Sequence, residues 1–92
     1  KPRPMLVVQA DTITDFDTVE VALITTTLID EPRLRPVIAA SEANGLREVS
    51  EVMVDKIQPV RRSRIGAVIG QLSALEMEQV TRAMAIVFGI AD

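Results

Sequence analysis

The residue best placed to do chemistry stands near the start of the chain, where Arg3 lies between Pro2 and Pro4. Proline at both positions excludes a helix and fixes an extended backbone. The apolar run Met5–Val8 that follows is continuous, which is typical of a strand buried on both faces. We therefore expect Arg3 at the mouth of a core strand, where it is either a structural salt-bridge partner or a site residue.

Three successive threonines provide the second group of chemically useful side chains. The segment from Thr18 to Leu28 is rich in β-branched residues and predicts a strand, with Thr25, Thr26 and Thr27 near its end. Strand alternation sends Thr26 to the face opposite Thr25. Strand propensity alone can explain each threonine, so their hydroxyls are candidates only.

Composition limits the chemistry available. The chain has no cysteine and no histidine, so any catalysis must use arginine, lysine, acidic or hydroxyl side chains. The net charge of −3 argues against indiscriminate binding of nucleic acid. A local basic groove on an acidic body stays possible, because the bases gather in three clusters: positions 1–3, Arg33 and Arg35, and Arg61, Arg62 and Arg64.

The elements that must position these side chains are short strands. Leu34–Ala39 predicts a third strand, with Pro36 at an edge or a bulge, and Glu51–Ile57 predicts a fourth. Pro59 marks a kinked continuation, and Val68–Gln71 favours a short last strand over a helix. Five short strands in so small a chain indicate a mainly β protein with a small, partly open barrel.

The C-terminal segment predicts a helix. Ser73 and Glu76 have the spacing of a capping box, and Gly89 is placed to end the helix. Apolar residues recur at helical spacing, which indicates a face that packs on the core or on a second copy of the chain. These residues are Met77, Val80, Met84 and Val87.

Length and hydropathy predict the organisation and location of the chain. Its 92 residues predict a single domain over 1–92. No apolar run approaches the roughly 20 residues of a membrane span, and no signal peptide is visible, so a cytoplasmic location is expected.

Five blocks in this order resemble the MazF/PemK-type toxins of bacterial type II toxin–antitoxin systems. Residues Arg3–Gln9 are similar to that family's Arg-Pro-x-Leu-Val-Val-Gln block. The other blocks are Val21–Thr26, Gly45-Leu46 with Ser50–Ile57, Arg64–Leu72 and Phe88–Ile90. The family carries a further first strand with an Arg/Lys-Gly-Asp motif, and this sequence starts after it.

The resemblance implies a CcdB/MazF-type, SH3-like barrel with a C-terminal helix, working as a homodimeric endoribonuclease. In the family, the positions of Arg3 and Thr25 carry the chemistry, and some members add an acid at the position of Asp55. Met53 stands where those members have a basic residue, and Lys56 replaces the usual glutamine. The first departure leaves Arg3 to do more of the electrostatic work.

The implied reaction is cleavage of single-stranded RNA by attack of the 2′-hydroxyl, giving a 2′,3′-cyclic phosphate without metal or cofactor. Arg3 is expected to clamp the phosphate and to give or take a proton, with Thr25 as second donor and Asp55 as a weaker base. The basic group at 61–64 is either a solvated face or an RNA clamp. The RNA-binding candidates are Lys1, Gln9, Thr26, Lys56, Arg61 and Arg62.

Two other functions stay open. One is a CcdB-type toxin that binds DNA gyrase and cleaves nothing, and the other is a barrel adaptor that binds a peptide. The toxin hypothesis implies a cognate antitoxin with a disordered acidic segment, inhibition of translation and growth, and possible binding of operator DNA with that antitoxin. No membrane partner is expected.

Overall fold

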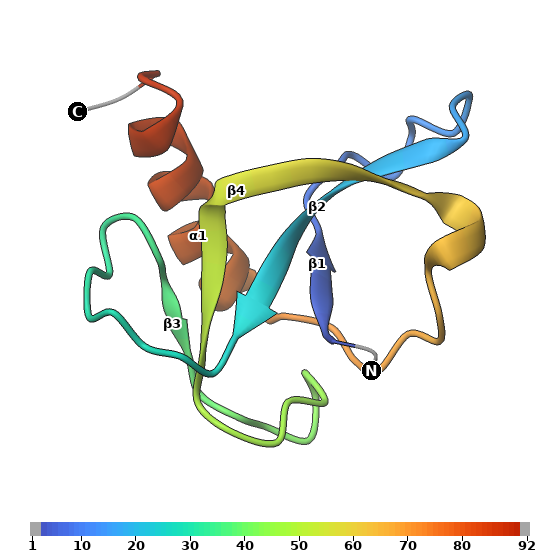
Figure 1. Cartoon of the computed structure of the whole chain (residues 1–92). Helices are drawn as coiled ribbons and strands as arrows, with labels where there is room; N and C mark the ends of the chain where they lie inside the picture. The colour runs from blue at the N-terminus through green and yellow to red at the C-terminus, as the bar shows by residue number, and fades with distance from the viewer. Residues whose placement is uncertain (1–2, 91–92) are drawn as a thin grey trace.

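A computed structural model describes residues 3–90 of the chain and shows one antiparallel sheet with a C-terminal helix (Figure 1). The order of the strands in the sheet is β1-β2-β4-β3, which leaves the sheet open. The elements are β1 (Met5–Val7), β2 (Thr18–Thr25), β3 (Val37–Ile38), β4 (Ser50–Arg61), a 3-10 turn η1 (Arg62–Arg64) and α1 (Ala74–Val87). The expected mainly β fold with one C-terminal helix is confirmed.

The long strand β4 bends sharply where its pairing with β2 changes register (Figure 1). Ile24 pairs with Val52, but Ala22 pairs with Ile57, so residues 53–56 of β4 face Leu23 alone. Extra residues on one strand of a pair bend that strand and increase its twist. The bend curves the sheet without closing it into a barrel.

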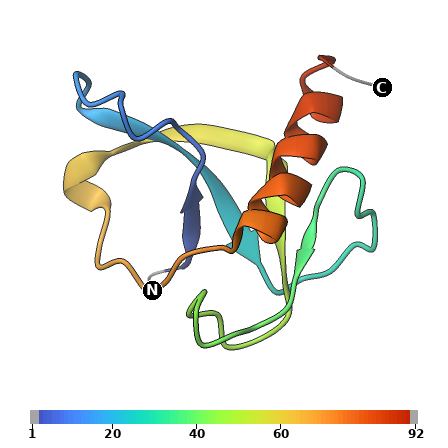
Figure 2. The same ribbon diagram turned by 180° about the vertical axis from the view of Figure 1, so that it is seen from behind.

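The core lies between one face of the sheet and α1, which crosses that face (Figure 2). It is built from small and branched apolar side chains: Ala22 and Ile24 of β2, Ile38 of β3, Val52 and Val54 of β4, and Val80 and Ala83 of α1. Strand alternation sends every second side chain to the other face. That second face, seen in Figure 1, is therefore not covered by α1.

The predicted capping box at the start of α1 is confirmed. The Glu76 amide donates to Ser73 Oγ at 3.1 Å, and the Ser73 amide donates to Glu76 Oε1 at 2.8 Å. Gly89 follows the helix with φ of 72°, the left-handed conformation that ends many helices. Between residues 3 and 90, no helical segment has the length and apolarity needed to cross a bilayer.

The predicted fifth strand at Val68–Gln71 is wrong, because this stretch runs as coil beside another loop. Its backbone meets the Ala43–Gly45 turn through one hydrogen bond, from the Gln71 amide to the Ala43 carbonyl at 2.9 Å. A Cβ on Gly70 would lie 2.4 Å from the carbonyl carbon of Asn44. Glycine is therefore needed here for close approach of two backbones and not for a strand.

Strand boundaries also differ from the prediction, and the second strand ends at Thr25 and not at Leu28. The third strand is reduced to Val37–Ile38, because Leu34 and Arg35 donate their amides to the Glu31 carbonyl in a turn. The fourth strand continues unbroken through Pro59 to Arg61. Pro59 faces Glu20, whose amide and carbonyl both bond on the β1 side, so this position needs no donor from β4.

Candidate active site

The register between β1 and β2 places Arg3 across from Thr25. Met5 pairs with Leu23 and Leu6 with Ala22, and the Ile24 amide continues the ladder to the Pro4 carbonyl at 3.2 Å. One further step brings Arg3 opposite Thr25, at a position of the ladder without backbone hydrogen bonds. Side chains at such positions lie on the same face and approach closely. The two residues therefore share the face that α1 leaves uncovered.

The hydroxyl of Thr25 has a defined hydrogen-bond partner. The Thr27 amide donates to Thr25 Oγ1 at 3.0 Å, so the oxygen is already an acceptor. A hydroxyl that accepts one hydrogen bond still has its own proton to donate. Thr25 is half-buried and Arg3 is exposed.

A buried carboxylate lies on the other side of Thr25, and the sequence did not suggest a role for it. Glu51 of β4 is the ladder partner of Thr25 and is 0% exposed. Its carboxylate accepts hydrogen bonds of 3.2 Å from the amides of Ile29 and Asp30, just after β2. The only signal in the sequence is an acidic residue beside the apolar run that starts at Val52.

The third predicted catalytic residue, Asp55, lies in the bend of β4 and is held by an arginine. Arg35 Nε donates to Asp55 Oδ1 at 3.0 Å and Arg35 Nη2 donates to Oδ2 at 3.2 Å. This two-point contact lowers the pKa of the Asp55 carboxyl below its ordinary value, and it raises the pKa of Arg35. A carboxylate stabilised in this way is a poorer proton acceptor, so Asp55 is less suited to be the base.

We expect Asp55→Asn to lower the free energy of unfolding by about 1 kcal/mol at neutral pH. The value is small because the Asp55 side chain is 34% exposed and water screens the pair. Since the folded pKa is lowered, the stabilisation is complete above about pH 5 and is lost as the pH falls through the folded pKa. Urea denaturation of both proteins at several pH values measures the difference.

The control for this prediction is Glu78→Gln, which removes the other ion pair recorded between residues 3 and 90. That pair joins Arg82 and Glu78 at 3.1 Å, with side chains 75% and 62% exposed, so its loss should have almost no effect. Equal stability of Asp55→Asn and wild type at pH 7 would contradict the role assigned to the Arg35–Asp55 pair.

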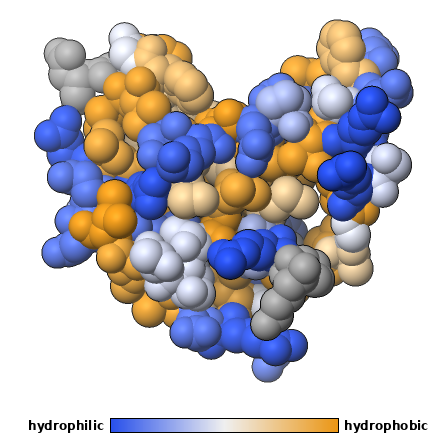
Figure 3. Space-filling model, viewed as in Figure 1, coloured by the Kyte–Doolittle hydropathy of each residue, from blue (hydrophilic) through white to orange (hydrophobic). Residues whose placement is uncertain are grey.

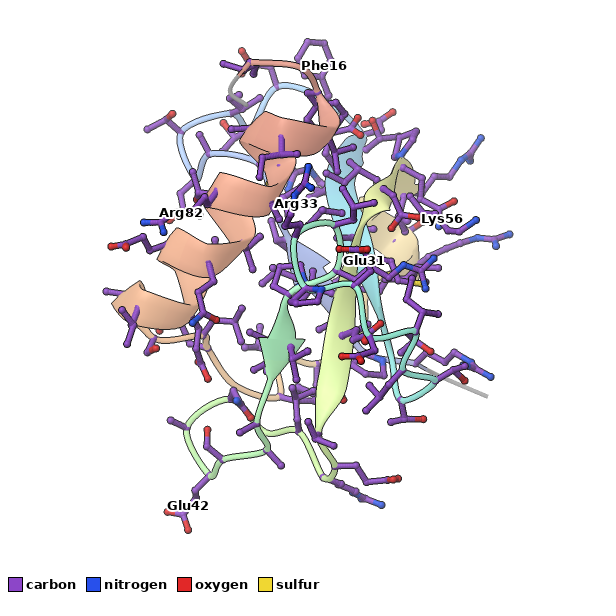
Figure 4. The ribbon with its side chains drawn as sticks, turned by 90° about the vertical axis from the view of Figure 1, so that its left-hand side faces the viewer. Phe16, Glu31, Arg33, Glu42, Lys56 and Arg82 are labelled. Carbon is purple, nitrogen blue, oxygen red and sulfur yellow. The ribbon has the colours of Figure 1, made fainter. Side chains whose placement is uncertain are left out.

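The predicted RNA-binding residues do not all lie in one place, although Gln9 and Arg62 lie together, since both donate to the Ile13 carbonyl. The side-chain amide of Gln9 already has partners in the hairpin between β1 and β2, because it donates to the Ile13 carbonyl and accepts from the Glu20 amide. Thr26 is exposed beyond the end of β2. Lys56 projects from the bend of β4, on the side of the sheet away from α1 (Figure 4). Lys1 lies outside the described residues.

The two arginines at the end of β4 have different surroundings. Arg62 Nε donates to the Phe16 carbonyl at 2.8 Å, and Arg62 Nη2 donates to the Ile13 carbonyl at 3.2 Å. These bonds hold the hairpin loop against the end of β4. Arg61 is the last residue of β4 and is exposed. Arg61 is therefore more available to a phosphate than Arg62.

The surface around the site is uneven in shape and polarity. Figure 3 looks onto the face opposite α1 and shows apolar side chains at its centre, between hydrophilic groups. A separate groove of about 570 Å³ runs between α1 and the segment around β3. The groove lining includes Pro32, Arg33, Val37, Leu75, Arg82 and Ile86.

No three acidic side chains within residues 3–90 are arranged to hold a metal ion.

Comparison with known proteins gives consistent matches. Residues 1–88 match the family described as PemK-like, MazF-like toxin of type II toxin-antitoxin system. The chain is 38% identical over 91 residues to the "Probable endoribonuclease MazF" of Mycolicibacterium smegmatis, covering 99% of this chain and 84% of that protein.

Solved structures share the fold. "Mycobacterium tuberculosis toxin MazF-mt6" matches with a TM-score of 0.84 and 28% identity, over 95% of this chain and 86% of that one. An "Endoribonuclease in complex with its cognate antitoxin from Mycobacterial species" matches with a TM-score of 0.81 and 21% identity, over 98% and 84% of the two chains. These matches do not favour the CcdB-type alternative. The chain belongs to the PemK-like, MazF-like family of toxins of type II toxin–antitoxin systems.

Proposed function

We propose that the protein is a metal-independent endoribonuclease that cleaves single-stranded RNA and leaves a 2′,3′-cyclic phosphate. The observation that supports this most strongly is the β1–β2 register, which brings an exposed guanidinium opposite a threonine hydroxyl on the uncovered face of the sheet. Its curated relative is named as a probable endoribonuclease, which supports the same activity.

In the proposed reaction, the 2′-oxygen of the substrate attacks the neighbouring phosphorus. The new P–O bond forms as the bond to the 5′-oxygen breaks. The 2′-hydroxyl loses one proton, and the leaving 5′-oxygen gains one and becomes a 5′-hydroxyl. Arg3 stabilises the negative charge that grows on the phosphate oxygens, and the Thr25 hydroxyl donates a hydrogen bond to the same phosphate. The hydrogen bond from Arg35 lowers the pKa of Asp55, so Asp55 has no part in the proposed proton transfer.

End-mapping of fragments from a long RNA tests this activity. The purified protein is incubated with the RNA in excess EDTA, and the fragment ends are identified by their chemistry. We expect cleavage with 2′,3′-cyclic phosphate and 5′-hydroxyl ends. Intact RNA, or fragments with 5′-phosphate ends, would contradict the proposal.

We propose three partners in addition to RNA: a cognate antitoxin with an acidic segment, a second copy of this chain, and operator DNA bound together with the antitoxin. Membership of a toxin–antitoxin family supports the antitoxin, and cleavage of cellular RNA would inhibit translation and growth in the cytoplasm. Exposed apolar side chains support association, since Val68 is 89% exposed and Leu75 is 67% exposed. The mass of the protein in solution, alone and with the antitoxin, tests the first two partners.

The two arginines at the end of β4 should contribute differently to RNA binding. We expect Arg61→Ala to reduce the salt dependence of RNA affinity by about one counterion, because an exposed guanidinium can contact a phosphate. Arg62→Ala should change this slope less and should lower the melting temperature, since Arg62 holds two loop carbonyls. Titration of a labelled RNA at several salt concentrations measures both slopes. Equal slopes for both variants and wild type would mean that the 61–64 group is only a solvated face.

A further inference from the structure

Glu51 is a charged group that the proposed mechanism does not use, although it lies beside the site. It is 0% exposed and is paired in the ladder with Thr25 on one side and Val37 on the other. Neither ion pair recorded for residues 3–90 includes it. Burying a carboxylate is costly, and this cost is offset by the loop amides that bond to it and by the charge of Arg35, whose pKa Glu51 helps to raise. The groups that offset this cost therefore indicate the role of the acid.

The hydrogen bonds of Glu51 indicate what it holds. The amides of Ile29 and Asp30 both point at its carboxylate, with N–O distances of 3.2 Å. Asp30 has a φ of 61°, a left-handed conformation that residues other than glycine seldom adopt. Such a turn directs successive amides to one side and forms a small site for an anion. In this protein the anion at that site is the Glu51 carboxylate.

This contact fixes the far end of the segment that orients Thr25. Only residues 26–28 separate Thr25 from Ile29, in the loop that leaves β2 in Figure 1. At the near end, the ladder holds Thr25, and the Thr27 amide bonds to its hydroxyl oxygen. At the far end, the Glu51 carboxylate holds Ile29 and Asp30. With both ends held, the Thr27 amide stays in place as donor to Thr25 Oγ1, which leaves the hydroxyl hydrogen of Thr25 available for another acceptor.

We infer that Glu51 is a positioning residue, whose buried carboxylate anchors the loop after β2 so that the Thr25 hydroxyl is held ready to donate to substrate. This inference rests on the proposed function of Thr25. Glu51 does not touch the reacting atoms, so its removal should act through Thr25 and not on binding of RNA.

The test uses Glu51→Gln, which keeps the size of the side chain but turns one acceptor into an NH₂ donor facing the loop amides. We expect kcat for RNA cleavage to fall about 10- to 100-fold with KM unchanged, the scale expected when a catalytic group is misplaced. The matched control is Ser50→Ala, the adjacent buried polar residue, whose hydroxyl donates to the Glu48 carbonyl. This control should keep its kcat even where its melting temperature falls.

Two further measurements separate positioning from general damage. Hydrogen exchange should show faster exchange of the Thr27, Ile29 and Asp30 amides in Glu51→Gln and unchanged exchange in Ser50→Ala. In a Thr25→Val background, Glu51→Gln should lower the remaining cleavage by less than about twofold, since the group it positions is gone. An unchanged kcat, unchanged exchange at Thr27, or the same loss in both backgrounds would overturn the inference. If the wild-type protein cleaves no RNA, the proposed function fails, and the exchange measurement still decides whether Glu51 anchors the loop.

Discussion

Arg3→Ala should lower kcat for RNA cleavage by about 10²- to 10³-fold, equivalent to about 3–4 kcal/mol of transition-state stabilisation. The reason is that charge grows on the phosphate during attack, and Arg3 is the cation that the register places beside Thr25. Arg3→Lys should fall between wild type and Arg3→Ala, because lysine keeps the charge but loses the two-point contact. Single-turnover cleavage of a short RNA carrying one mapped site measures all three rates.

The control for this effect is Arg47→Ala, which removes another exposed arginine from a loop between β3 and β4. We expect its rate to match wild type at physiological salt. If Arg3→Ala stays within about threefold of wild type in the same assay, Arg3 cannot be the main source of electrostatic stabilisation.

Thr25→Val should lower kcat by about 10²-fold, because the variant keeps the branched shape but has no hydroxyl proton to donate. The change also removes the acceptor of the Thr27 amide, so the loop after β2 loses one of its ties. Thr25→Ser keeps the hydroxyl and should retain most of the activity. The same single-turnover assay measures these rates, and thermal unfolding shows whether the fold is retained.

Thr18→Val is the matched control, since it makes the same chemical change at the other end of β2. Thr18 pairs with Arg61 and lies far along the strand from Thr25. We expect wild-type cleavage from this variant. Similar losses from Thr18→Val and Thr25→Val would show that the effect comes from the strand and not from a particular hydroxyl.

The elements that were predicted well depend on local rules. The capping box of Ser73 and Glu76 needs only residues three apart, and the apolar run at Met5 indicates a strand without knowledge of its partners. The prediction that this strand is buried on both faces is wrong, because β1 is an edge strand and Val7 is 46% exposed. The fold class followed from the resemblance and from the count of short β-rich segments. The stretch at Val68–Gln71 was misread because Gly70 allows close approach to Asn44, which is 26 residues earlier in the sequence and has no local signal.

The candidate site shows the same division. Arg3 and Thr25 were named from residue type and family resemblance, but their placement across a ladder depends on a register that only the folded sheet defines. Asp55 was named as a base, yet its partner Arg35 comes from a turn 20 residues earlier and makes the carboxyl more acidic. Glu51 was overlooked because its role depends on the path of the loop after β2. The surroundings of Asp55 and Glu51 depend on hydrogen bonds between residues far apart in the sequence, which local sequence patterns do not predict.

The most direct test of the account is a double-mutant cycle that joins Arg3→Ala and Thr25→Val, with the single-turnover rate of RNA cleavage as the measurement. Two side chains that stabilise one phosphate act as a unit, so the double variant should be only slightly slower than Arg3→Ala alone. A loss equal to the product of the two single losses would mean that the residues act independently, and it would contradict a shared phosphate site.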